Sequence, residues 1–537
     1  MRAKSGDETL KKHINQCGGN AMYISPSIQN ELIEICGSII QETIVDRINK
    51  ASSFAILADE TMDITQTEQL TLCARYIDVR GDVLIVKENF LQFVSIFDSS
   101  GRGIAGVILK SIRNLGVNVS KIVRQGYDGA SAMRGNFNGA QAAIKELHPT
   151  AIYVHCSSHS LNLAISHSCS IQAFRNCVGI VKTITKFIKS SAKRTKILED
   201  IMKTNLSNEK FKKIISFCET RWIENHDAII RFKELYPEII QLLEEVKASG
   251  NCDASSKADN LISTITKSEF YINLLACRDI FSVTLPLSKA LQQIHLDLNG
   301  ALIHVKSINN TVLNKRKNAE YEFQKLYLEL LNTFTSLDLD VKLPRLASYQ
   351  NHPGNIKNQN TDPEQYFRQS IYIPFLDCFA AQLIERFSKH EDTLASLNKV
   401  LPKYCVNVDI NLCNFRIYAD FIDIENLMGE MEVWASKWNL REPLSRPDTA
   451  LSAMEECGNI FFPNIYCLLS ILATLPITTA TAERTFSTLE RVKTAIRNAT
   501  KEERLTGLTL LSIFRDIPVC PKKVIEKFSP NPRRMSL

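Results

Sequence analysis

The sequence has few features of a secreted or membrane-embedded protein. Its 15 cysteines stand singly and form no C-x-x-C pair, which is unlike a disulfide framework and typical of a reducing compartment. The first residues, MRAKSGDETLKKH, contain no apolar stretch of the signal-peptide kind. The strongly apolar run at 467–477 is far shorter than the ~20 residues that span a bilayer. We therefore expect neither secretion nor membrane insertion, and we expect this run to be buried.

Neither positive nor negative charge strongly predominates in the sequence. The 64 Lys and Arg residues against 58 Asp and Glu residues give a net charge of +6, which permits nucleic-acid binding without arguing for it. Hydrophobic residues make up 45% of the 537 positions, enough for a packed core, and this length predicts about three to four domain-sized units. A disordered or fibrous chain is excluded.

Five apolar runs in the first third of the chain predict strands, and the stretches between them have helical periodicity. The predicted strands are 54–58, 70–78, 83–97, 121–123 and 151–155, and the predicted helices are 28–50, 103–115, 130–147 and one around 161–165. The order β-β-β-α-β-α-β-α is the layout of an RNase H-like domain with a mixed five-stranded sheet. In this layout the first and fourth strands are neighbours.

Two aspartates stand where those neighbouring strands end. Asp59 follows the first run, and Asp128 lies between the fourth run and the next predicted helix. Taken singly, Asp59 also fits a turn residue and Asp128 a helix N-cap. Their matching positions favour two metal ligands instead.

The remaining two thirds of the chain read differently. Residues 223–451 have long helical patterns, with an exposed loop expected at 338–366. A helix with one apolar stripe follows the run at 467–477, and Glu483 lies beside that stripe.

Several ordered motifs carry a family resemblance. They include FAILADETMDITQTEQL (54–70), RQGYDGASAMRG (124–135), YVHCSSHSLNLA (153–164), CETRW (218–222) and LPITTATAERTFSTLERVKTAIR (475–497). In these motifs the chain resembles the hAT transposases, in the branch of the zinc finger MYM-type and 52 kDa repressor-like proteins. The resemblance implies an RNase H-like α/β core that is interrupted by a large all-α insertion and completed by a helical C-terminal dimerisation region.

The resemblance also implies the catalytic acids, which are Asp59, Asp128 and Glu483. Carboxylates are the ligands that Mg²⁺ or Mn²⁺ prefers, and two such ions can activate the attacking oxygen and stabilise the leaving oxygen in phosphodiester cleavage. Glu60 and Asp63 are alternatives for the first acid, although the family pattern favours Asp59.

Two further motifs have alternatives that stay open. The Cys156-x-x-His159 pair resembles a recurring hAT motif and implies a supporting role beside the active site. Because no second Cys/His pair has matching spacing, structural zinc is not expected. Trp222, with Arg221 before it, resembles the family's DNA-binding tryptophan that stacks on a flipped base; a core tryptophan is the other interpretation.

These observations give a domain plan and a function. The plan is a helical lead-in at 1–50, the first part of the core at 51–222, the insertion at 223–451, the dimerisation region with the third acid at 452–516 and a tail at 517–537. We expect a nuclear protein that binds DNA, associates with itself and cleaves DNA if active. The alternative is a domesticated, non-catalytic regulator with nuclear protein partners. Residues 1–50 contain only Cys17, Cys36 and His13 as zinc-type ligands, so the zinc finger usual in the family is not expected, and truncation and domestication both stay open.

Overall fold

The computed structural model describes residues 8–16, 25–63, 66–81, 83–205, 213–216, 225–249, 251–294, 296–344, 362–394, 396–406, 412–493 and 502–530. The chain divides into two compact units. The first unit comprises Met1–Cys156 and Thr393–Leu537, and the second comprises Ser157–Asp392. This division by packing does not coincide with the boundaries at 222 and 451 in the predicted domain plan, which stays a prediction.

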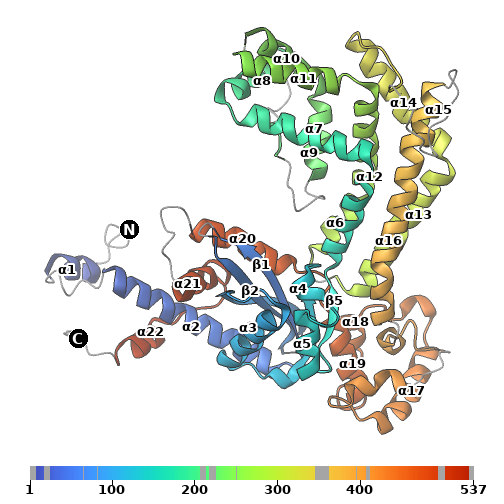
Figure 1. Cartoon of the computed structure of the whole chain (residues 1–537). Coiled ribbons are helices and arrows are strands. Elements are labelled where there is room, and N and C mark those ends of the chain that lie inside the picture. The colour runs from blue at the N-terminus through green and yellow to red at the C-terminus, as the bar shows by residue number, and fades with distance from the viewer. Residues whose placement is uncertain are drawn as a thin grey trace. The chain divides into compact units, whose positions relative to one another are not determined.

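The first unit contains the predicted mixed five-stranded sheet (Figure 1). Its strands are β1 (Phe54–Met62), β2 (Glu68–Arg80), β3 (Val83–Ser95), β4 (Ile122–Tyr127) and β5 (Ile152–His155), in the spatial order β3-β2-β1-β4-β5. The first three strands pair antiparallel, whereas β4 runs parallel to β1 and β5 runs parallel to β4. The first and fourth strands are therefore neighbours, as predicted.

Strand β1 is longer than its apolar run predicts. We expected it to stop before Asp59, but pairing with β2 continues to Met62 opposite Glu68. Pairing with β4 ends earlier, at Leu57 opposite Gly126. Hydrogen bonds to the antiparallel neighbour hold the polar end of β1 extended, so hydrophobicity alone misplaces the end of this strand.

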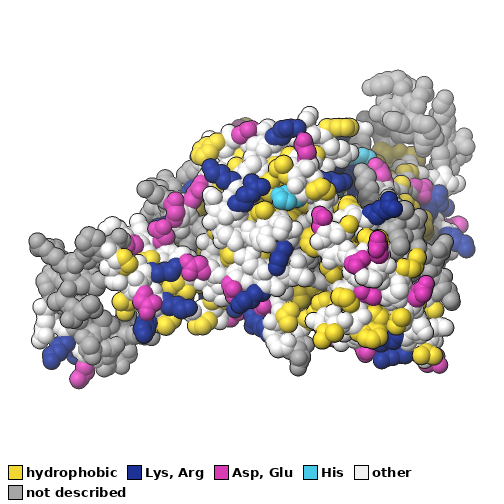
Figure 2. All heavy atoms as spheres, turned by 90° about the horizontal axis from the view of Figure 1, so that it is seen from below, with side chains coloured by type: hydrophobic (Ala, Val, Ile, Leu, Met, Phe, Trp, Pro, Cys, Tyr) yellow, Lys and Arg dark blue, Asp and Glu magenta, His cyan; other side chains and the backbone are white. Residues whose placement is uncertain are grey.

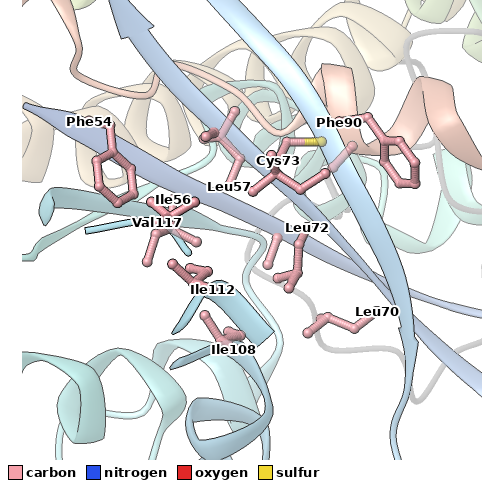
Figure 3. Packing of buried hydrophobic residues seen from close by; sticks show 14 of the residues in the cluster. Phe54, Ile56, Leu57, Leu70, Leu72, Cys73, Phe90, Ile108, Ile112 and Val117 are labelled. Atoms are coloured by element: carbon pink, nitrogen blue, oxygen red, sulfur yellow. The ribbon is translucent and has the colours of Figure 1, made fainter. Parts of the chain in front are cut away.

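Alternate side chains of the strands build two apolar faces (Figure 3). On one face, Ile56 and Leu72 pack with Ile108 and Ile112 of α3 (Gly101–Asn114) in one buried cluster. Leu57, Cys73 and Phe90 belong to the same cluster and lie on the other side of the strands, as Figure 3 shows. Both faces of the sheet are thus covered, as in a layered α/β unit.

The helix predicted at 130–147 is broken. It forms α4 (Ser131–Arg134) and α5 (Ala140–Leu147), because the glycine-containing segment between them folds back on itself. A Cβ atom at Gly139 would lie 2.3 Å from the backbone nitrogen of Gly135, so only glycine fits this approach.

Segments from both ends of the chain pack together in the first unit. Helix α2 (Pro26–Lys50) packs against α21 (Glu502–Ile513) and α22 (Pro521–Phe528). A Cβ at Gly37 would lie 2.7 Å from the Cα of Gly507, so the α2 and α21 backbones touch. The other helices of this unit are α1 (Glu8–Gln16), η3 (Val119–Lys121), η5 (Leu397–Val400), η6 (Leu412–Tyr418), α17 (Ile424–Asn439), η7 (Pro443–Ser445), α18 (Ala450–Glu455), α19 (Pro463–Ala473) and α20 (Ala480–Val492). The apolar run at 467–477 lies mainly in α19 and is largely buried, as predicted.

All the regular secondary structure among the described residues of the second unit is helical (Figure 1). They are α6 (Ser157–Ser168), α7 (Gln172–Lys189), α8 (Ala192–Asn205), α9 (Asn225–Glu234), α10 (Tyr236–Ser249), α11 (Cys252–Ile265), α12 (Ser268–Leu291), α13 (Leu298–Lys317), α14 (Ala319–Ser336), α15 (Pro363–Phe367), the π-helix η4 (Arg368–Tyr372) and α16 (Ile373–Leu394). Within the described residues, α12 alone is long and apolar enough to cross a membrane, and 67% of its most apolar window is buried. A core helix passes the same test, so α12 is weak evidence for a membrane span.

Candidate functional site

The pairing of β1 with β4 brings two of the predicted acids to the same level of the sheet. Leu57 and Gly126 are the last paired residues of the two parallel strands. Asp59 and Asp128 each lie two positions further along. Equal offsets from one register pair put the two aspartates at corresponding places on neighbouring backbones.

Asp59 also faces the helix that carries the third acid. Asp59 is directly opposite Thr71 of β2, and side chains at opposed positions project from the same face of a sheet. The Thr71 hydroxyl accepts a hydrogen bond of 3.2 Å from the Thr485 hydroxyl of α20. Glu483 lies in the first turn of that helix, two residues before Thr485, and is half-buried.

The segment that precedes α20 packs closely against β4 on the face of the sheet from which the Asp59 side chain projects. A Cβ at Gly126 would lie 2.7 Å from the Pro476 Cβ and 3.0 Å from the Leu57 Cδ2. Leu57 and Asp59 share one face because they are two residues apart in the strand. Asp59 and the chain that carries Glu483 therefore meet on one side of β1 and β4.

The electrostatics around Cys73 support this arrangement. Burial raises the pKa of the Cys73 thiol well above its ordinary value, the carboxylates of Glu88 and Asp59 raise that pKa further, and Arg484 lowers it. Arg484 is adjacent to Glu483 in α20. The first turn of α20 is thus close enough to the Asp59 side of the sheet for charges to act on a common neighbour.

The start of α20 is fixed by Cys156. The backbone nitrogen and the hydroxyl of Thr479 both donate to the Cys156 Sγ at 3.4 Å. The Thr479 carbonyl in turn accepts from the Glu483 nitrogen at 3.0 Å. Cys156 is therefore two hydrogen-bonding steps from the backbone of the third acid, although nothing in the C-x-x-H spacing indicated this contact.

Asp128 lies in a hydrogen-bonded loop after β4. Its Oδ1 accepts from the Ala130 nitrogen at 3.1 Å, and its carbonyl accepts from the Tyr153 hydroxyl at 3.0 Å. The N-cap residue of α4 is Ala130, so the helix N-cap interpretation of Asp128 is wrong. The loop fixes its backbone beside β5.

Glu60, one alternative for the first acid, faces the α3 side because it follows Asp59 in the strand. Its Oε1 is buried and accepts no hydrogen bond from any described residue. Burial, followed by the nearby charges of Asp128 and Glu68, raises its pKa to about 7. The charged form of the Glu60 carboxyl group is thus disfavoured by burial and by the nearby charge of Asp128.

Asp63, the other alternative, has a different partner. Its Oδ2 forms an ion pair of 2.5 Å with the Nζ of Lys493, and both side chains are buried. Lys493 directly follows α20, and no motif or spacing in the sequence singles it out.

The donor chemistry of the site fits a hard divalent ion, because Asp59, Asp128 and Glu483 all offer carboxylate oxygens. Among the described residues, however, no group of three or more His, Cys, Asp or Glu side chains is gathered closely enough to hold a metal ion. The type of donor therefore suits Mg²⁺ or Mn²⁺, but binding would require the three carboxylates to move toward a common point.

The other predicted site residues are placed only in part. Cys156 is the last residue of the first segment of the first unit, and His159 lies on α6 of the second unit. Arg221 and Trp222 lie outside the described residues, so their predicted role in DNA binding stays a prediction.

Two parts of the chain match known families. Residues 2–139 match the ZMYM1/FAM200, RNase-like domain, and residues 424–517 match the hAT family C-terminal dimerisation region. The chain is hAT-related. The second match includes α20 and Glu483, so the hAT-related C-terminal region packs into the same unit as the RNase-like domain.

Relatives of this hAT-related chain match it almost end to end. It is 24% identical over 528 residues to the human (Homo sapiens) protein named 52 kDa repressor of the inhibitor of the protein kinase, and the match covers 96% of this chain and 69% of the relative. The mouse (Mus musculus) protein of the same name is 24% identical over 529 residues, with the same coverage.

Proposed function

We propose that the chain is a nuclear, hAT transposase-derived protein whose first unit is an RNase H-like core for metal-dependent cleavage and transfer of DNA strands. The second unit would then be the helical insertion predicted from the sequence. The observation that carries this proposal is the equal offset of Asp59 and Asp128 from one register pair, on the side of the sheet where α20 brings Glu483.

In this proposal Asp59, Asp128 and Glu483 would hold Mg²⁺ or Mn²⁺. When bound, the metal would activate the attacking oxygen and stabilise the leaving oxygen of the phosphodiester. Asp59 lies in the part of β1 that follows the apolar residues of this strand, and pairing with β2 keeps that part extended. Asp128 is held by its loop, and Glu483 is oriented by the bonds of Thr479 to Cys156. In this proposal the three acids would thus be supplied by three separate elements.

Nicking of a supercoiled plasmid in the presence of Mn²⁺ tests this activity. We expect cleavage by the full chain and its loss in Asp59→Asn and Glu483→Gln. A matched control is Asp46→Asn, which removes an exposed carboxylate on α2 and should leave cleavage intact. Absence of cleavage by the unmodified chain, or cleavage unchanged by both substitutions, would refute the catalytic proposal.

A second candidate function is self-association as a non-catalytic nuclear regulator. The matched dimerisation region exposes several large apolar side chains, which individually are normal on surfaces but here occur close in sequence. Figure 2 shows hydrophobic side chains grouped toward the right of the face seen from below. Among its described residues, the exposed large apolar side chains of this region are Met428, Val433, Leu440, Leu444, Ile460, Phe461 and Ile513. The relatives named as repressors also favour a regulatory role.

Sedimentation of point variants tests self-association. Leu444→Asp and Ile460→Asp place a charge at two highly exposed positions of the dimerisation region, and each should lower the solution mass of the full chain. Leu147→Asp, at an exposed position of α5, is the matched control and should not. A full chain that is monomeric before substitution would refute this function. Imaging of a tagged full chain would test the nuclear location.

A further inference from the structure

Buried polar groups hold α20 at both of its ends. At its start, Thr479 donates to Cys156, and the Thr481 hydroxyl donates to Glu88 of β3. Glu88 also pairs with Arg75 of β2 at 2.7 Å, and these two side chains are only 4% and 2% exposed. At the other end of α20, Lys493 pairs with Asp63. The helix is therefore anchored to the rest of the first unit at both of its ends.

The ion pair between Asp63 and Lys493 is buried and joins two charges from opposite ends of the chain. The two side chains are 1% and 8% exposed, and the residues are 430 positions apart. Asp63 Oδ1 accepts from the Thr67 nitrogen at 3.2 Å, and Oδ2 also accepts from the Gln69 Nε2 at 3.3 Å. Removing one charge of such a pair leaves the other charge buried and uncompensated, whereas removing both does not.

The pair joins the ends of the two elements that carry the first and third acids. Asp63 directly follows β1, four residues after Asp59. Lys493 directly follows α20, which carries Glu483 in its first turn. With Thr485 bonded to Thr71 in between, the ion pair fixes how α20 lies along β1. Both carboxylate oxygens of Asp63 already accept hydrogen bonds from other groups of the protein.

We propose that Asp63 and Lys493 are positioning residues, which hold α20 so that Glu483 can share a metal ion with Asp59 and Asp128, and that Asp63 is not itself a metal ligand. This inference rests on the proposed nuclease function. It assigns a role to a carboxylate that sequence reasoning left as an alternative first acid.

A comparison of single and double variants tests the assignment. Asp63→Asn keeps the side-chain shape and removes the negative charge of the ion pair, and Lys493→Met keeps the length and removes its positive charge. The double variant Asp63→Asn/Lys493→Met contains neither charge. Ile108→Ala, in the α3 layer of the core, is the control because it lowers stability without touching α20. Each full chain is titrated with Mn²⁺ by calorimetry, and its Tm is measured without metal.

We expect each single variant to weaken Mn²⁺ binding by about 10-fold or more, as for other groups that orient metal ligands. The double variant should recover most of that affinity, and Ile108→Ala should lower Tm while keeping the affinity. Two results would overturn the assignment. A double variant as weak as Asp63→Asn alone would make Asp63 a ligand, and single variants that bind like the unmodified chain would remove the positioning role.

The unmodified chain separates this inference from the function on which it rests. If it binds no Mn²⁺, the nuclease proposal fails, whatever the variants do. Hydrogen exchange of the α20 amides then decides whether the pair anchors the helix. Protection should fall in both single variants and return in the double variant. Unchanged protection in the single variants would overturn the anchoring itself.

Discussion

Glu60 should make the protein less stable as the pH rises toward neutrality, and Glu60→Gln should remove this loss. Burial raises the pKa of Glu60 from its ordinary value of 4.5 to about 7, with Asp128 and Glu68 adding to the shift. A group whose pKa is raised by folding contributes no penalty below its unfolded pKa, where it is protonated in both states. Stability is then lost as the pH rises from about 4.5 to about 7, and the penalty is constant above that.

The size of this penalty follows from the shift. A change of 2.5 pH units, from 4.5 to about 7, corresponds to a ceiling of about 3.4 kcal/mol at about 1.4 kcal/mol per unit. Glu60 is only partly buried, and solvent screening reduces electrostatic effects at such positions. We therefore expect Glu60→Gln to raise the free energy of unfolding by about 1 to 2 kcal/mol at pH 8. At pH 4.5 it should have little effect.

Urea denaturation at pH 4.5, 6 and 8, with EDTA to exclude metal binding, measures the difference. Glu146→Gln, which removes an exposed carboxylate on α5, should show no such pH dependence and is the matched control. A Glu60→Gln variant that is equally stable to the unmodified chain at pH 8, or that gains stability only at pH 4.5, would refute the burial argument.

Two further substitutions test the packing around the site by urea denaturation. Cys156→Ala removes the acceptor of the two Thr479 donors and should cost about 1 to 3 kcal/mol, whereas Cys252→Ala, at an exposed cysteine, should be neutral; equal effects would contradict the anchoring role of Cys156. Gly507→Ala would put a Cβ 2.8 Å from a backbone oxygen of α2 and should cost about 1 to 3 kcal/mol. Gly429→Ala, where no described atom lies within 4 Å of the new Cβ, should instead stabilise its helix by up to about 1 kcal/mol. A harmless Gly507→Ala would show that α2 and α21 can separate at low cost.

The sequence was sufficient for the sheet because its signals are local. Apolar runs bounded by turns marked all five strands, and their order with the intervening helices put Asp59 and Asp128 on neighbouring strands. The ends of elements were less accurate where non-local contacts decide them. Strand β1 continues beyond Ala58 because β2 pairs with it, and the helix predicted at 130–147 breaks because two glycine backbones touch.

The candidate site was predictable only for residues that a motif marks. Asp59 and Asp128 came from the strand order together with the hAT resemblance, and Glu483 came from the resemblance alone. The structure puts Asp59 and Asp128 at equal offsets from the last register pair of β1 and β4. Lys493 and Thr479 could not be found this way, because their buried partners lie 430 and 323 positions away and leave no spacing signal. Such contacts depend on tertiary packing, which a single sequence does not encode in a readable pattern.

The C-terminal region cannot be tested by deletion as if it were only a dimerisation module. Glu502 and Thr506 of α21 accept hydrogen bonds from the Ser95 and Phe93 nitrogens of β3, at 2.9 and 3.3 Å. Because β3 is an edge strand, a chain that ends before α21 would expose unpaired backbone donors, which promote aggregation. A truncation that also ends before α20 would in addition remove Glu483. A changed mass after truncation would therefore report a damaged sheet, and only point substitutions at exposed positions such as Leu444 separate self-association from folding.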